Sequence, residues 1–144
     1  MNRADKLKEQ KEIIIKIVLR RYPGVQAIYL FGSYVTGGER PDSDVDIALL
    51  FKPETAGRTG SLTMSDLKFE IERALNKKLD TVNLRLMNTV FQKEIIAADG
   101  RIYCGDEYKA DEFEMLTMSK YQRLNEERHG IIENALTGGS FYNL

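Results

Sequence analysis

The segment 44–51, DVDIALLF, constrains the fold more than any other part of the chain. Its second half is apolar at every position, which is typical of a strand covered on both faces in the middle of a sheet. Its first half places Asp44 and Asp46 at alternate positions, so their carboxylates project from one face about 6.6 Å apart. Core packing requires no acids there, and their like charges repel unless a cation lies between them. The segment therefore predicts a central strand that begins at a charged site.

Strand and helix patterns alternate on both sides of this segment. Residues 25–31 and 79–86 have strand patterns, and 101–104 is a candidate edge strand. Apolar spacing and capping residues predict helices over 4–21, from Ser61 or Thr63 to Leu75, and from Asn88 to Gly100. A further helix is predicted over 107–136, with Gly130 as a candidate break. Residues 52–60 are predicted to form a loop. We expect an α+β fold, a small mixed β-sheet flanked by helices. The expected single domain covers residues 1–144, with its core at about 25–104 and a helical C-terminal region at 106–137.

The composition excludes several kinds of site. Cys104 and His129 are the sole members of their residue types, which excludes an intrachain disulfide and a zinc site of Cys and His ligands. A metal would have to be bound by carboxylates, which suit Mg²⁺ or Mn²⁺. The net charge of -1 gives no general attraction for nucleic acid, and apolar runs reach only five residues, as in 47–51. We expect a cytoplasmic protein with no membrane segment and no direct binding of nucleic acid.

A second group of residues is expected to face the two aspartates. Gly32 and Ser33 follow the first strand, where a glycine lets the backbone approach a phosphate and the serine hydroxyl can donate a hydrogen bond to it. Asp80 lies early in the third strand, and its carboxylate joins Asp44 and Asp46 if that strand lies beside the second. Three carboxylates can hold two Mg²⁺ ions, one lowering the pKa of an attacking hydroxyl and the other binding a triphosphate. The sequence therefore predicts an aspartate triad opposite a phosphate-binding turn.

These residues match a known pattern. The spacing Gly32-Ser33-x10-Asp44-x-Asp46, followed by a strand aspartate, resembles the nucleotidyltransferase superfamily of DNA polymerase beta, and specifically its minimal nucleotidyltransferases. The resemblance covers residues 25–104 and implies a polymerase-beta-like fold. It also implies ATP as substrate and two Mg²⁺ ions, which Mn²⁺ can replace. Within this group the chain is most similar to antitoxins whose partners are HEPN ribonuclease toxins.

The resemblance implies a specific reaction. AMP is transferred from ATP to a tyrosine hydroxyl of a cognate HEPN toxin, a HepT-like ribonuclease, which is thereby neutralised. The three aspartates take the catalytic and metal-binding roles, and the glycine–serine turn binds phosphate. Members often carry Ala and Arg where this chain has Val35 and Thr36, so Arg40 is the candidate for the missing nucleotide contact. The chain lacks the Arg-x4-His-x-Tyr pattern of HEPN ribonucleases, which indicates the antitoxin side of the pair.

The sequence is also compatible with two other functions. The superfamily includes aminoglycoside-type enzymes that modify a small molecule, although these usually have a second domain and fewer than 40 residues follow Gly105 here. A non-catalytic antitoxin would instead neutralise its partner by binding alone. Residues 106–144 carry a net charge of -4, and with Phe113, Met115 and Tyr121 this region is the predicted docking surface.

Overall fold

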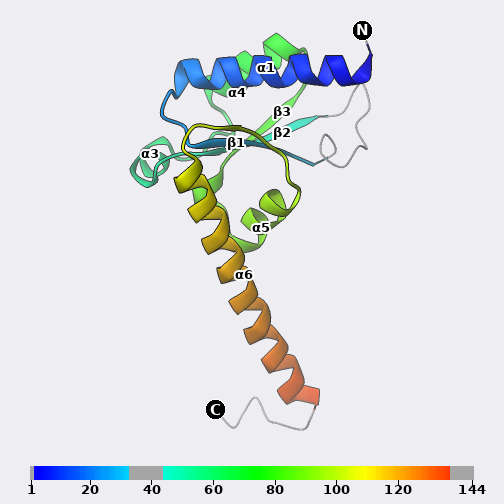
Figure 1. Cartoon of the computed structure of the whole chain (residues 1–144), viewed down its shortest axis with the longest axis vertical. Coiled ribbons are helices and arrows are strands. Elements are labelled where there is room, and N and C mark those ends of the chain that lie inside the picture. Colours follow the sequence, from blue (N-terminus) through cyan, green and yellow to red (C-terminus); the bar gives the residue numbers. More distant parts are fainter. Residues whose placement is uncertain (1, 33–43, 137–144) are drawn as a thin grey trace.

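The computed structural model of the chain describes residues 2–32 and 44–136. Its elements in chain order are α1 (Arg3–Arg21), β1 (Ala27–Phe31), β2 (Val45–Leu50), α3 (Pro53–Thr59), α4 (Asp66–Leu75), β3 (Leu79–Asn83), the 3-10 turn η1 (Leu84–Leu86), α5 (Thr89–Ala97), β4 (Arg101–Cys104) and α6 (Glu107–Leu136). Helices lie on both faces of the sheet, and α6 extends well beyond it (Figure 1).

β2 lies inside the sheet, as its apolar sequence predicts. The strand order is β3-β2-β1-β4. β1 pairs antiparallel with β2 and with β4, whereas β2 and β3 are parallel. The parallel pair needs a crossover, and α3 and α4 supply it. These pairings confirm the expected α+β class with a small mixed sheet.

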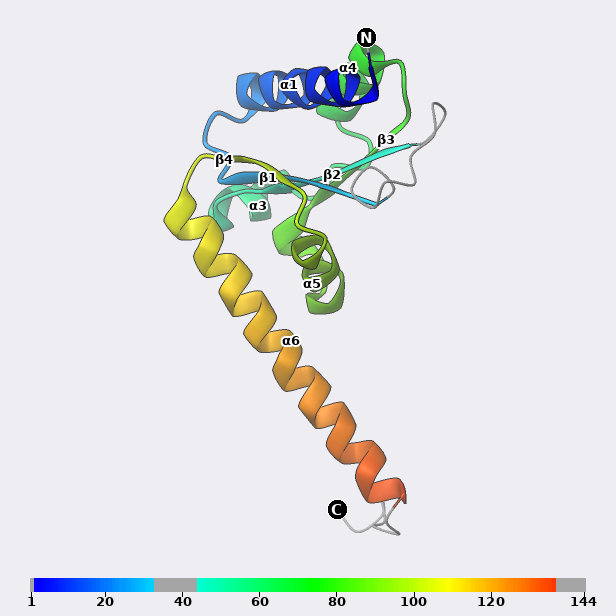
Figure 2. The ribbon, with the colours of Figure 1, turned by 45° about the vertical axis from the view of Figure 1, so that its right-hand side comes forward.

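Each face of the sheet has its own apolar core. On one face, Ile14 of α1 and Ile71 of α4 pack over Ile47 and are fully buried. On the other face, Ile95 of α5 and Ala110 of α6 pack over the sheet and are equally buried. Figure 2 shows this division, with α1 and α4 above the strands and α5 and α6 below them.

α6 is one continuous helix, and Gly130 does not produce the predicted break. Its first turns are anchored, because Ala110 and Thr117 are buried. After Tyr121 the side chains of residues 122–129 are exposed, and both ribbon views show this part leading away from the sheet (Figures 1 and 2). No helix within residues 2–32 and 44–136 is both long enough and apolar enough to cross a membrane.

The segment 52–60, predicted as a loop, contains α3, so that prediction was wrong. Pro53 occupies the first turn, where its missing N–H removes no helical hydrogen bond. The buried Asn83 Nδ2 donates to the carbonyl oxygens of Ala56 and Gly60, at 3.1 and 2.9 Å, and so satisfies the end of the helix. A seven-residue helix that buries Ala56 has too little apolar periodicity to be recognised.

The start of α4 also differs from the prediction. Ser65 is the N-cap, and its hydroxyl accepts from the amide of Lys68 at 3.2 Å. The predicted caps, Ser61 and Thr63, lie before the helix. Met64 is consequently outside α4 and 77% exposed, rather than on its buried face.

The third strand is shorter than the alternation of its sequence predicts. β3 ends at Asn83, and η1 replaces the last three residues, which leaves Leu86 exposed. Arg85 holds this turn against the sheet, because its Nη2 donates to Gln26 Oε1 at 2.8 Å and its Nε donates to the Phe51 carbonyl. Alternating apolar residues fit both a strand and such a turn, so the pattern alone does not fix the strand's end.

Candidate active site

The two aspartates of the second strand lie where the sequence places them. Asp44 is exposed and immediately precedes β2, and the partly buried Asp46 is the second residue of the strand. The antiparallel register pairs Asp46 with Phe31 at the end of β1. Asp46 therefore stands where β1 ends and β2 begins.

Asp80 lies directly beside Asp46. The parallel register of β2 and β3 pairs Val45 with Leu79 and Asp46 with Asp80. Directly paired residues project from the same face of a sheet, so the two carboxylates are neighbours. This is the face on which Val82 packs against the second core. The predicted adjacency of the second and third strands is confirmed.

Asp46 has an unusual protonation equilibrium for a carboxyl group. Burial raises its pKa to about 6, and a side-chain hydrogen bond with Asp80 and the charges of Asp80 and Asp44 act in the same direction. A protonated Asp46 can donate to the Asp80 carboxylate, whereas two ionised groups repel. The site therefore concentrates negative charge that a proton or another cation would relieve.

Gly32 makes room for the Asp46 carboxylate. It follows β1 with a φ of +74°, in the left-handed region. A Cβ built on Gly32 would lie 2.3 Å from Asp46 Oδ2. A Cβ at that distance would displace the Asp46 carboxylate, so glycine favours this arrangement through its small size as well as its backbone conformation. The sequence predicts Gly32 for its approach to a phosphate, and its contact with Asp46 comes from the structure.

The donor chemistry of the site fits a hard divalent cation. Asp46 and Asp80 are adjacent carboxylates, and Asp44 contributes to the electrostatic field at Asp46. Carboxylate oxygens are the ligands that Mg²⁺ and Mn²⁺ prefer. In the described part of the chain, no group of three or more His, Cys, Asp or Glu side chains is already arranged to hold a metal ion. Metal binding by the three aspartates stays a prediction.

Two predicted site residues, Ser33 and Arg40, lie outside the described residues. Sequence reasoning missed Phe31, which forms the apolar side of the site. Phe31 is the direct strand partner of Asp46, and its ring meets that of Phe91 on α5 edge-on, with 5.8 Å between centroids. Its place just before Gly32 at a strand end was the available signal.

The fold and this site define a class of protein. Residues 12–108 match the family model described as polymerase beta nucleotidyltransferase. The match covers most of the chain and includes the three aspartates and Gly32. The chain therefore belongs to the polymerase-beta-like nucleotidyltransferase family.

Within this family, named relatives are similar along most of their length. The protein adenylyltransferase MntA of Shewanella oneidensis is 34% identical over 123 residues, 85% of each chain. A crystal structure of a toxin–antitoxin with AMP-PNP matches with a TM-score of 0.65 and 30% identity, over 88% of this chain and 98% of that chain. A structure of tri-AMPylated Shewanella oneidensis HEPN toxin in complex with MNT antitoxin matches with a TM-score of 0.62 and 27% identity, over 90% and 98% of the two chains.

Proposed function

We propose that this chain is a cytoplasmic antitoxin that transfers AMP from ATP to a tyrosine hydroxyl of a HEPN ribonuclease toxin and thereby neutralises it. The observation that carries the proposal is the register of β2 and β3, which sets Asp46 beside Asp80 next to Gly32. The names of the relatives support it, because one is a protein adenylyltransferase and one complex contains an AMPylated HEPN toxin.

Each site residue has a role in this reaction. Asp44, Asp46 and Asp80 would hold Mg²⁺, which when bound neutralises the charge of the triphosphate. Gly32 and its neighbouring amides would hold phosphate oxygens. The acceptor oxygen bonds to the α-phosphorus of ATP while the bond to the bridging oxygen breaks and pyrophosphate leaves. Asp80 is exposed and lies directly beside Asp46, and it would take the acceptor's proton.

Labelled ATP tests this function. The chain is incubated with α-labelled ATP, Mg²⁺ and the product of the neighbouring gene, as the candidate HEPN protein. We expect label on a tyrosine of the HEPN protein and loss of at least a hundredfold in labelling rate with Asp44→Ala plus Asp46→Ala. The matched control is Asp106→Asn, because Asp106 also carries a carboxylate but caps α6, and asparagine caps equally well.

The outcomes separate the proposal from its two rivals. Label on an aminoglycoside and not on the HEPN protein would identify a small-molecule enzyme. Neutralisation of the toxin by the double alanine variant, without any label, would identify a protein that acts by binding alone. Either result contradicts the proposed transfer to a protein tyrosine.

The exposed half of α6 is the proposed docking surface for the HEPN partner. Of the three side chains predicted for docking, Met115 is exposed, whereas Phe113 and Tyr121 are partly buried. The exposed apolar residues instead continue along the helix to its end: Met118, Leu124, Ile131, Ile132 and Leu136.

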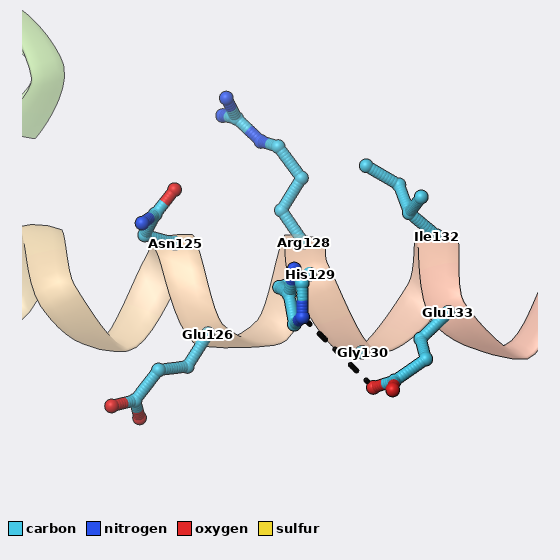
Figure 3. A pocket seen from close by; sticks show the side chains of 7 residues that line it. All are labelled: Asn125, Glu126, Arg128, His129, Gly130, Ile132 and Glu133. Carbon is cyan, nitrogen blue, oxygen red and sulfur yellow. Dashed lines mark ion pairs between the residues drawn. The ribbon is translucent and has the colours of Figure 1, made fainter.

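The surface around Gly130 is open to a partner. Figure 3 shows the residues that line an open hollow here, all of them from the last turns of α6. His129 Nε2 lies 4.0 Å from Glu133 Oε2, and both side chains are mostly exposed. His129 is therefore a surface residue in this structure, and the hollow is open rather than an enclosed pocket.

A further inference from the structure

A second polar pocket lies away from the aspartates, where η1 and α5 meet the first half of α6. Its cationic lining residues are Arg85, Lys109 and Lys120, and its volume is about 190 Å³. Arg85 follows the end of β3, whereas Asp80 lies near its beginning. Three strand steps of about 3.3 Å already place Asp80 roughly 10 Å from Asn83, and Arg85 lies beyond Asn83 in η1. The pocket is thus separate from the candidate active site.

Arg85 is a partly buried cation whose hydrogen bonds go to neutral groups. Its Nη2 donates to Gln26 Oε1 at 2.8 Å, and its Nε donates to the Phe51 carbonyl. The guanidinium lies over the Phe113 ring, 5.1 Å from the centroid. In residues 2–32 and 44–136, no carboxylate oxygen lies within ion-pair distance of it. Removing a guanidinium from water without an anion is unfavourable.

The electrostatic surroundings of Arg85 agree with this geometry. Burial lowers its pKa, and the more distant charges of Glu112 and Glu54 and the Tyr29 hydroxyl offset this effect in part. Glu112 lines the same pocket, but it faces Lys109, with 3.8 Å between Oε1 and Nζ. Three cationic side chains and one carboxylate therefore leave the pocket with a formal excess of positive charge.

The size of the pocket limits the ligand. Sites for drug-sized molecules occupy roughly 300–1,000 Å³. At about 190 Å³ this pocket is too small for a nucleotide, but it can hold one oxyanion with water. The buried Gln92 and Thr117 add polar groups to its wall.

We propose that the pocket between η1, α5 and α6 binds one phosphate-sized oxyanion, with Arg85 at its inner side and Lys109 and Lys120 at its opening. The bound anion contacts Arg85, which is attached to the sheet, and the two lysines, which belong to α6. It thereby strengthens the attachment of α6 to the body of the protein. The proposal does not depend on the proposed transfer of AMP.

A phosphate titration tests the site directly. The full chain is titrated with sodium phosphate at constant ionic strength set by sodium chloride, and the NMR signal of the Arg85 Nε–H is followed. We expect a saturable shift and a rise in the unfolding midpoint with phosphate that chloride does not give. Sodium sulfate, a tetrahedral dianion of similar size, is expected to produce the same response.

Variants at the opening test the site without removing Arg85, which also holds η1 through Gln26 and Phe51. Lys109→Gln plus Lys120→Gln is expected to weaken phosphate binding at least tenfold. Lys8→Gln, at an exposed position of α1, is the matched control and is expected to leave the affinity unchanged. An Arg85 signal that does not respond, or a response that the double variant retains in full, overturns the proposal.

Discussion

At the scale of single residues, Asp46 is a carboxyl group whose negative charge the fold opposes. Its neighbours are the Asp80 and Asp44 carboxylates, the apolar Phe31 in the adjacent strand and the backbone of Gly32. Phe31 and Gly32 exclude water from the Asp46 carboxyl group, and the two carboxylates add negative charge beside it. A site that stabilises the neutral form of a carboxyl group also attracts a cation that can replace the proton.

The raised pKa of Asp46 predicts a specific pH dependence of stability. Its value is about 6 in the folded protein against an ordinary 3.8, so the folded state binds more protons between these pH values. Stability from this group is therefore lost as the pH rises from about 4 to above 6. Asp46→Asn removes the effect, and we expect it to stabilise the protein at pH 7.5 by up to about 1 kcal/mol, discounted for partial exposure.

Urea unfolding of the wild type and Asp46→Asn at several pH values measures this difference. The two proteins should converge below about pH 4, where both side chains are neutral. Adding Mg²⁺ at pH 7.5 should raise the unfolding midpoint of the wild type and leave the variant nearly unchanged. A stability difference that is the same at every pH would contradict the assignment to Asp46.

Gly32→Ala is predicted to be strongly destabilising. The alanine would have to adopt a positive φ and place its Cβ against the Asp46 carboxylate. We expect a loss of about 2 kcal/mol or more in the free energy of unfolding. Gly57→Ala is the control, because Gly57 lies in α3 with open space around it, and it should stabilise the protein by about 0.5–1 kcal/mol. Equal effects at the two glycines would refute the close packing at Gly32.

At the scale of elements, a polar cluster attaches α6 to the sheet. The buried Tyr29 of β1 donates to Glu114 Oε2 at 2.8 Å, and Arg101 of β4 donates to the same oxygen at 2.7 Å. Arg101 also donates to Asp111 at 3.0 Å. Burial, with the nearby Glu114 acting in the same direction, raises the pKa of the Tyr29 hydroxyl, so it remains a donor at physiological pH.

Tyr29→Phe is expected to loosen α6 without unfolding the protein. Glu114 keeps its contact with Arg101, so the loss should be about 1 kcal/mol, as for a single hydrogen bond. Amide exchange in the first turns of α6 should accelerate more than exchange in α1. Tyr108→Phe, on the same helix and 73% exposed, should change neither quantity. Uniform acceleration of exchange across α1 and α6 would disprove a local role.

The elements also show how far the sequence predicts this structure. The apolar run of β2 was sufficient because the strand is buried on both faces, and the spacing in α1 was sufficient because burial of one helix face imposes a period. α3 was missed because it buries little, and the end of β3 was missed because Arg85 turns the chain through contacts with distant Gln26 and Phe51. Such contacts leave no mark in the local pattern.

The candidate site was also predicted only in part from the sequence. The spacing of Asp44 and Asp46 identifies a pair of acids, and the strand pattern after Leu79 adds Asp80 on the condition that this strand lies beside the second. Which of the three has the raised pKa depends on burial, and burial depends on Phe31 and Gly32 after folding. The Tyr29 and Glu114 contact likewise joins residues far apart in the chain, so no local motif predicts it.

At the scale of the whole molecule, the body carries the candidate site and the far half of α6 carries exposed apolar side chains. Leu124 is 41% and Ile131 53% exposed. Residues seven apart lie on nearly the same side of a helix, so these two belong to one stripe. The arrangement suits a protein that modifies a partner held by a separate surface.

The double variant Leu124→Asp plus Ile131→Asp tests that surface, on the assumption that the proposed HEPN partner is correct. We expect the stability of the isolated chain to change by less than about 0.5 kcal/mol, because both side chains are exposed. Affinity for the HEPN protein, measured by calorimetry, should fall at least tenfold. Ser119→Asp adds a carboxylate on a different side of α6 and should bind as the wild type does. Unchanged affinity in the double variant would exclude this stripe as the docking surface.

The parallel alignment of β2 with β3 has one more consequence. A shift of β3 along β2 by a single residue would turn every side chain of β3 to the other face. The Asp80 carboxylate would then enter the apolar core beneath α1 and α4, where Leu79 and Thr81 now lie. The acidic partner of Asp46 would disappear without any change in composition. Activity of this protein would therefore report that β2 and β3 have paired in the correct register.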